Sequence, residues 1–319
     1  MRRIIIFITV LTFISITIPS AFILRFGVYK IPSNENITKI NVYVKEEDKV
    51  VEMSKAQYLK EVVAAEMPAS FEAEALKAQA VAARSYLTAR SLSYRSNGYP
   101  AEHKGADVCT DSKHCKAWIS ESKRKESWGK DAKKNWDKIN LAVESTKNEV
   151  IFYENEIISA VFHSTSSGKT ENSKDVWGGD KPYLVSVESP GEENAPNYTS
   201  TLTIPKHEFI RIAEENIEGV DFSGELTGEI VRSDTGGIIS IVIGKVPVKG
   251  TVFRALYCLK STNVNIIQTD DAVTFNVKGY GHGVGMSQYG ANAMAKNGAT
   301  YKEILTHYYQ GTNISEFKE

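Results

Sequence analysis

One glutamate lies where an ordinary surface carboxylate would not be expected. Leu59, Val62 and Val63 repeat at helical spacing, and the next position of this apolar stripe is Glu66. Pro68 disfavours helical geometry in the residue before it, so the helix is predicted to end near Glu66. A helix C-terminus and burial both disfavour a negative charge. We therefore expect Glu66 to stay protonated at a higher pH than a free carboxyl and to act as a general acid.

The same position also permits a structural role, in which Glu66 pairs with an arginine at the helix junction. A second helix is predicted from about Glu72, and Arg84 lies at the edge of its inner stripe. Arg84 is therefore a candidate to contact Glu66 or a bound substrate. A surface arginine whose stem covers apolar neighbours is the alternative.

Four potential metal ligands occur close together in a polar segment. His103, Cys109, His114 and Cys115 follow the pattern H-x5-C-x4-H-C. Imidazole and thiolate are the usual zinc ligands, and a closed tetrahedral site takes four of them. Such a metal would be structural, because no open position remains for a substrate, and it would supply much of the local order. The spacing equally permits a disulfide between the two cysteines, which is natural outside the membrane, or free thiols. Cys258, in a predicted strand, is expected to be a buried free thiol.

A loop rich in hydroxyl groups has the composition of a sugar-binding surface. Residues 162–172 read FHSTSSGKTEN, and Trp177 follows. Ser167 and Lys169 are its candidate substrate contacts, since such groups can bond to sugar hydroxyls while a tryptophan stacks on the sugar face. Ordinary turns share this composition.

A second loop, residues 279–290, carries glycine at nearly every second position. Glycines let a backbone approach a ligand closely. No βαβ unit with a downstream acid supports a dinucleotide site here. His282, Gln288 and Tyr289 are its polar candidates for substrate binding, with His282 expected to bind or orient rather than to catalyse.

The elements that must position these residues mix helices and strands without a βαβ rhythm. Helices are predicted at 54–66, from about 72, at about 205–217 and at 291–309, a hairpin at 150–162, and several strands within 226–278. This pattern predicts an α+β fold with an antiparallel-type sheet and a substrate cleft. We divide the chain into a membrane anchor (1–25), a tether with a first strand (26–50), a catalytic region (51–200), a smaller β-rich subdomain (201–260) and a return to the catalytic region (261–319).

Composition excludes two other classes of protein. The chain has 319 residues, and 38 Lys and Arg against 39 Asp and Glu give a formal net charge of -1. A nucleic-acid-binding protein usually needs a basic excess to neutralise phosphates. Three cysteines are too few for a small disulfide-built scaffold.

The N-terminal residues indicate export. Residues 4–24 contain no charged side chain, Arg2 and Arg3 precede them, and Arg25 follows. Such a run is long enough to span a bilayer, and the leading arginines favour a cytoplasmic N-terminus with an extracytoplasmic body. A cleaved signal peptide is the alternative, because residues 19–21 (PSA) provide small side chains near the end of the run.

Several segments, taken in order, resemble the stage II sporulation protein D family. They are YLKEVVAAEMPASFEAEALKAQAVAARSYL (58–87), FHSTSSGKTENSKDVWGG (162–179), PYLVSVESP (182–190), GYGHGVGMSQYGANAMA (279–295) and ILTHYYQGTNI (304–314). Proteins of this family are peptidoglycan lytic transglycosylases of endospore-forming bacteria. They act while the mother-cell membrane engulfs the forespore.

The resemblance implies roles for particular residues and partners. Glu66 corresponds to the catalytic acid, Arg84 to the helix arginine, and the cysteine–histidine cluster to a zinc site in clostridial-type members. The expected substrate is peptidoglycan glycan strands, denuded of stem peptides. The expected partners are an amidase/endopeptidase and a membrane scaffold protein, and the expected location is the cell membrane, with the body between the mother cell and the forespore.

Three other activities remain open from the residues. A glycoside hydrolase would need a second carboxylate, for which Glu171, Asp175 and Asp180 are candidates. A non-catalytic protein would bind glycan and recruit an amidase, as related amidase enhancers do. A metallopeptidase would use the cysteine–histidine cluster.

Overall fold

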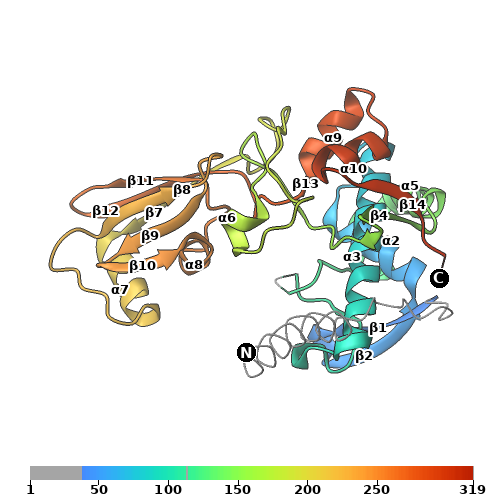
Figure 1. The fold of residues 1–319 in the computed structure, drawn as a ribbon, viewed down its shortest axis with the longest axis horizontal. Helices are drawn as coiled ribbons and strands as arrows, with labels where there is room; N and C mark the ends of the chain where they lie inside the picture. Colours follow the sequence, from blue (N-terminus) through green and yellow to red (C-terminus); the bar gives the residue numbers. More distant parts are fainter. Residues whose placement is uncertain (1–37, 113, 319) are drawn as a thin grey trace, which may run out of the picture. The chain divides into compact units, whose positions relative to one another are not determined.

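The computed structural model describes residues 38–112 and 114–318. The α+β class with mainly antiparallel sheets is confirmed, because the described strands form small sheets of two or three strands among separate helices (Figure 1). The predicted anchor, and the tether up to residue 37, lie outside the described residues. Within the described ranges, no helix is long and apolar enough to cross a membrane.

Two helices meet at the predicted catalytic carboxylate. Helix α2 (Lys55–Glu66) begins after Ser54, whose side chain accepts a hydrogen bond from the backbone N–H of Gln57. It ends at Glu66 as predicted, because Met67 before Pro68 is extended, at φ -122° and ψ 142°. Helix α3 (Ala73–Asn97) follows and packs against α2. Buried alanines along α3 let the neighbouring helices approach closely.

Several of the remaining elements outside residues 199–278 pack against α3. Strand β4 and helices α5, α9 and α10 all contact it. Three sheets occur in this part, with strand orders β2-β1-β3, β14-β4-β5 and β13-β6. The elements are β1 (Lys39–Val44), η1 (Lys45–Glu47), β2 (Lys49–Ser54), η2 (Ala101–His103), β3 (Val108–Cys109), α4 (Glu121–Trp128), η3 (Gly129–Asp131), α5 (Ala132–Ser145), β4 (Glu149–Tyr153), β5 (Glu156–Ile157), β6 (Phe162–His163), α6 (Ser173–Trp177), β13 (Met286–Ser287), α9 (Gln288–Lys296), α10 (Tyr301–Tyr308) and β14 (Asn313–Glu316).

Residues 199–278, which we call the β-rich unit, have their own hydrophobic core. Two three-stranded antiparallel sheets and two helices enclose four aromatic residues, and the rings of Phe209 and Tyr257 stack with centroids 4.7 Å apart. The other two are Phe253 and Phe275. The elements of the unit are β7 (Thr199–Pro205), α7 (Lys206–Asn216), β8 (Thr227–Arg232), β9 (Ile238–Ile243), β10 (Val246–Lys249), α8 (Gly250–Leu256), β11 (Val264–Gln268) and β12 (Ala272–Lys278).

The β-rich unit extends beyond the segment 201–260 that the sequence suggested. Strand β12 pairs with β7 from Ala272 opposite Pro205 to Lys278 opposite Thr199, so the last strands share the core of the first. This pairing joins residues distant in sequence, and local patterning does not encode it.

Three local expectations need correction. The 150–162 hairpin is shorter, closing between β4 and β5, while β6 pairs with β13. The single closing helix is two helices, because Gly298 (φ 91°) breaks it and Thr300 forms a capping box with Glu303 that starts α10. Cys258 is exposed and follows α8, so it is not a buried strand residue.

Candidate active site and metal centre

A groove of about 890 Å³ opens at the C-terminal end of α2. One wall comes from the α2–α3 junction, a second from α4 and the start of α5, and a third from the two predicted ligand loops. Its lining residues are Ala65, Glu66, Met67, Pro68, Ala69, Ser70, Phe71, Arg124, Trp128, Asp131, Lys134, Asn135, Lys138, Ser164, Gln288 and Tyr289. The groove therefore contains the predicted acid, Glu66, and two of the predicted substrate-binding residues, Gln288 and Tyr289.

Glu66 lies half-buried in this groove, and each of its carboxylate oxygens accepts one hydrogen bond. The backbone N–H of Ala117 donates to Oε1 at 2.9 Å, and the Gln288 side-chain amide donates to Oε2 at 3.1 Å. Gln288 is itself held at 3.5 Å from Oε1 of the buried Gln79. The carboxylate thus has a defined orientation. Its predicted protonation stays a prediction.

The start of α9 positions Gln288 and Tyr289. The Ser287 hydroxyl accepts a hydrogen bond from the Gly290 N–H, which caps the helix. The Tyr289 N–H donates to the Ser164 carbonyl at 3.1 Å, and its ring packs edge-on against Phe71 at 4.9 Å. The glycine-rich loop and the hydroxyl-rich loop therefore meet beside Glu66.

A buried carboxylate that sequence reasoning missed fastens these two loops together. Glu192 accepts hydrogen bonds from the backbone and hydroxyl of Ser166, from the Ser287 hydroxyl at 2.6 Å and from the Ser189 hydroxyl. Burial raises the pKa of Glu192 despite these donors. Sequence patterns alone do not single out Glu192, because its donors come from three separate segments.

The wall opposite these loops is basic. Arg124, on α4, donates through Nε to the Ala64 carbonyl at 2.7 Å, close to the end of α2. Lys138, on α5, donates to the Phe71 carbonyl. These contacts hold the α2–α3 junction against α4 and α5.

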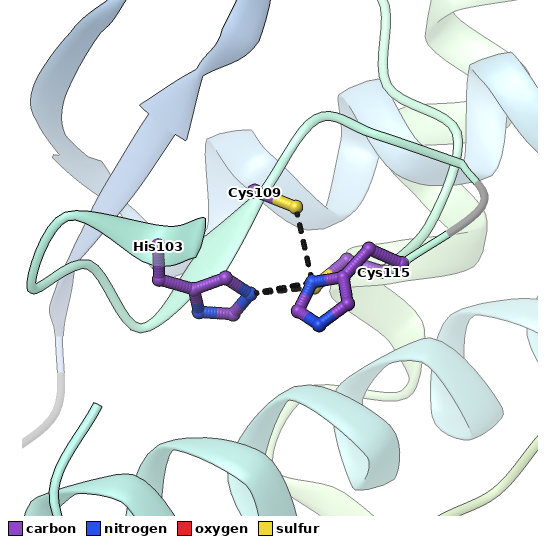
Figure 2. A group of neighbouring side chains, drawn as sticks. His103, Cys109 and Cys115 are labelled. Atoms are coloured by element: carbon purple, nitrogen blue, oxygen red, sulfur yellow. Dashed lines mark hydrogen bonds between the residues drawn. The ribbon is translucent and has the colours of Figure 1, made fainter. Parts of the chain in front are cut away.

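The four predicted metal ligands converge. Figure 2 shows His103, Cys109 and Cys115 turned toward a shared point, and the ligand atoms of these residues and His114 all lie within 4.8 Å of one another. His103 Nε2 is 3.0 Å from His114 Nδ1 and 3.2 Å from Cys115 Sγ. Both cysteines are free thiols, so the disulfide alternative is absent from this structure.

The donor set fits a tetrahedral soft metal. Ligand atoms about 2.0–2.3 Å from a zinc ion lie roughly 3.3–3.8 Å apart, and the Cys109 Sγ to His114 Nδ1 distance is 3.5 Å. His103 Nδ1 lies 3.0 Å from the Ala106 carbonyl, which fixes the ring with Nε2 facing the cluster. Burial raises the pKa of Cys115 to about 12. A cation would favour the thiolate form instead.

The cluster is joined to Glu66 by two residues. After Cys115 come Lys116 and then Ala117, whose N–H bonds to Glu66. Lys116 is buried, with Nζ 3.7 Å from the ring centroid of Phe162, and burial lowers its pKa to about 8 although the Glu66 charge opposes this. Fixing the cysteine–histidine cluster therefore also fixes a hydrogen-bond donor to Glu66.

Glu61, which sequence reasoning also missed, anchors the next part of this segment. It is buried on α2 and accepts hydrogen bonds from Trp118 Nε1 at 2.8 Å, from the Glu121 N–H at 2.9 Å and from Gln57. An acid five residues before Glu66, at the start of the apolar stretch 62–65, was the available clue.

Arg84 is not among the residues that line the groove, and its assignment as a substrate-binding residue stays a prediction. Its side chain is buried, and the guanidinium donates to the carbonyls of Val143 and Glu149 at 3.1 and 3.0 Å and lies 3.4 Å from the Thr146 hydroxyl. Arg84 therefore fastens α3 to the end of α5 and the start of β4. The inner stripe of α3 extends further around the helix than the sequence suggested.

Ser167, Lys169 and His282 line a separate small cavity rather than the main groove. Lys169 is exposed and pairs with Glu188 at 2.6 Å. The His282 ring lies 5.1 Å from the exposed Trp177 ring, and burial lowers the pKa of His282 well below its ordinary value. These three residues do not line the groove that contains Glu66. Their assignment as substrate-binding residues stays a prediction.

Comparison with known proteins gives consistent matches. A family model described as "SpoIID: Stage II sporulation protein" matches residues 43–153. The chain is 37% identical to stage II sporulation protein D of Bacillus amyloliquefaciens, over 88% of this chain and 80% of that protein. It is 38% identical to the Bacillus subtilis (strain 168) protein, over 87% and 79%.

A more distant relative carries a different name. The chain is 28% identical to the amidase enhancer of Bacillus subtilis (strain 168), over 81% of this chain and 40% of that protein. The two stage II sporulation D proteins match at higher identity, and the alignment covers most of both chains, whereas it covers 40% of the amidase enhancer. The chain belongs to the stage II sporulation protein D family.

Proposed function

We propose that this sporulation protein is a lytic transglycosylase that cleaves the β-1,4 bond between MurNAc and GlcNAc in peptidoglycan glycan strands. The observation that carries the proposal is Glu66, a carboxyl group oriented by the Ala117 N–H and the Gln288 amide inside an open groove. A glycan strand needs such an open path, because it enters and leaves the site laterally.

In the proposed reaction Glu66 acts twice. Its carboxylic acid gives a proton to the glycosidic oxygen as the bond to the anomeric carbon breaks. The resulting carboxylate then takes the proton of the MurNAc 6-hydroxyl, whose oxygen attacks the anomeric carbon. The products are a 1,6-anhydroMurNAc end and a free GlcNAc hydroxyl, and no water is consumed. Ala117 and Gln288 keep the carboxyl group in place during both steps.

The distribution of acids around the groove favours a single catalytic carboxylate. The three candidates for a hydrolase partner, Glu171, Asp175 and Asp180, do not line the groove. Among the described lining residues, Asp131 is the other acid, and it is exposed at the start of α5. Asp131 therefore provides the matched test of a two-carboxylate mechanism.

The experiment is product analysis with the wild type, Glu66→Gln and Asp131→Asn on denuded glycan strands. We expect Glu66→Gln, which preserves size, to lose about 10²–10⁴-fold in cleavage rate, and Asp131→Asn to retain most of it. Mass spectrometry should find 1,6-anhydro ends. Hydrated reducing ends, or equal loss in both variants, would instead indicate a hydrolase.

We also propose that the cysteine–histidine cluster binds one structural zinc ion, held by His103, Cys109, His114 and Cys115. When bound, the ion would hold the polar segment around these four residues together and would take no part in the reaction. Its proposed effect on catalysis is indirect, through Lys116 and Ala117. A metallopeptidase role is not favoured, because four protein ligands leave no position for substrate.

A non-catalytic role remains the second candidate, motivated by the amidase enhancer among the relatives. In that case the groove would bind glycan, and the purified wild-type protein would cleave none. The proposed setting is the space between mother cell and forespore, with membrane attachment through the N-terminus. The proposed partners are an amidase/endopeptidase and a membrane scaffold protein.

A further inference from the structure

A buried carboxylate outside the groove forms no ion pair within the described residues. The Glu171 side chain is 5% exposed, and its Oε2 atom has no hydrogen-bond partner. Within residues 38–112 and 114–318, neither a hydrogen bond nor an ion pair joins this carboxylate to another residue. A buried charge in this condition is unfavourable unless something binds it.

The carboxylate is fixed in a slot between two glycines. The Glu171 N–H donates to the Gly283 carbonyl at 2.8 Å. A Cβ at Gly283 would lie 2.7 Å from Glu171 Cγ, and one at Gly237 would lie 2.3 Å from Oε1. Any larger residue at either position would collide with the side chain. Its place is therefore defined by the fold rather than by a flexible surface.

Glu171 lines a cavity of about 10 Å³, which has room for a single particle of the size of water. Thr262 and Asn263 line the same cavity. The Asn263 amide nitrogen donates to the Thr235 carbonyl at 2.8 Å, which leaves its side-chain oxygen as the available group. Carboxylate, hydroxyl and amide oxygens are ligands of hard cations such as Ca²⁺.

Two lysines also line the cavity. Lys169 Nζ is 2.6 Å from Glu188 Oε1, and Lys278 Nζ lies 5.9 Å from the Tyr198 ring centroid. Neither forms an ion pair with Glu171.

We propose that this cavity binds one hard cation, with Ca²⁺ as the fitting class, through Glu171, Thr262 and Asn263. A single charged ligand predicts weak binding, with a dissociation constant of about 10⁻⁴–10⁻³ M. The site joins the hydroxyl-rich loop to the β-rich unit. The proposal does not depend on glycan cleavage.

The test is thermal unfolding of the full chain in 10 mM CaCl₂ or in choline chloride of equal ionic strength. We expect Ca²⁺ to raise the wild-type Tm by about 2–4 °C and to leave Glu171→Gln unchanged. Glu193→Gln, which removes an exposed carboxylate that does not line the cavity, should keep the wild-type shift. Glu66→Gln should also keep the wild-type shift, which would show that Ca²⁺ does not bind at the acid of the groove.

Two outcomes would overturn the proposal. An unchanged wild-type Tm would mean that the cavity holds water or a proton only, and an equal shift in Glu171→Gln would place Ca²⁺ elsewhere. If Glu171→Gln does not fold, Thr262→Val serves in its place. Terbium luminescence, excited through tyrosine and tryptophan, provides a second measurement. Tb³⁺ should bind the wild type and be displaced by Ca²⁺, whereas little Tb³⁺ should bind Thr262→Val.

Discussion

Two regions of the molecule are ordered by different means. The β-rich unit buries a cluster of aromatic and aliphatic side chains between two sheets. Residues 101–112 and 114–121, which we call the metal-ligand segment after its four candidate ligands, contain short elements. They are connected by contacts among two cysteines and two histidines and by hydrogen bonds to the acids Glu61 and Glu66. Burial is spread over many residues in the first region, whereas a few specific side chains maintain the second.

The candidate catalytic group depends on the second region for its orientation. Glu66 is oriented by Ala117, which follows the metal-ligand segment's last cysteine by two positions. Single substitutions in that segment should therefore change activity strongly, while single substitutions in the β-rich unit should change stability first.

The largest effect is expected from Cys115→Ser. Loss of one thiolate should reduce bound zinc from about one per chain to none, increase amide exchange throughout residues 103–121 and reduce glycan cleavage by about 10²-fold or more. Metal analysis and hydrogen exchange measure the first two effects. The control is Cys258→Ser, which alters an exposed thiol and should leave all three unchanged. Full metal binding by Cys115→Ser would contradict the proposed ligand set.

In the β-rich unit, the largest effect is expected from Phe253→Ala. Phe253 is fully buried, so its truncation should cost about 3–5 kcal/mol of unfolding free energy. Hydrogen exchange should increase in the β-rich unit, while cleavage below the new transition stays near wild type. Val252→Ala is the control, because Val252 is 45% exposed and should change stability by less than about 0.5 kcal/mol. If Phe253→Ala lost glycan cleavage at temperatures where the β-rich unit is still folded, the proposed difference between the two regions would be wrong.

A smaller effect is expected from Glu61→Gln. In this variant an NH₂ group replaces one carboxylate oxygen and faces one of the three N–H donors. The free energy of unfolding should fall by about 1–3 kcal/mol, and the segment around Trp118 should become more mobile. Exchange of the Ala117 and Glu121 amides measures this loosening. Glu52→Gln alters an exposed acid and serves as the control. Unchanged exchange at both amides would show that the cysteine–histidine cluster alone orders the segment.

The smallest effect is a pH dependence at Glu192. Its pKa is higher in the folded chain than the ordinary value of 4.5. Above about pH 4.5 the unfolded chain releases this proton while the folded chain still holds it, so Glu192 reduces stability as the pH rises through that window. Unfolding of wild type and Glu192→Gln between about pH 4.5 and pH 7 should show a steeper loss in the wild type. Parallel curves would assign the pH dependence to other groups.

Local spacing was sufficient for the parts of the site that lie within one element. The start and end of α2 and the place of Glu66 at its C-terminus follow from a cap, an apolar stripe and a proline. The four candidate ligands also converge as their short separation suggested. In both cases the residues concerned are neighbours along the chain, so local geometry determines their positions.

Tertiary packing decided the rest. Gln288 meets Glu66 across more than two hundred residues, Arg84 faces the interior, and His282 lies in another cavity from Tyr289. A periodic pattern identifies which face of a helix is apolar but not which distant loop covers it. The sequence by itself thus determined the candidate acid and the ligand set, whereas long-range packing selected the donors that orient Glu66, because those contacts exist only once α2, α9 and the metal-ligand segment come together.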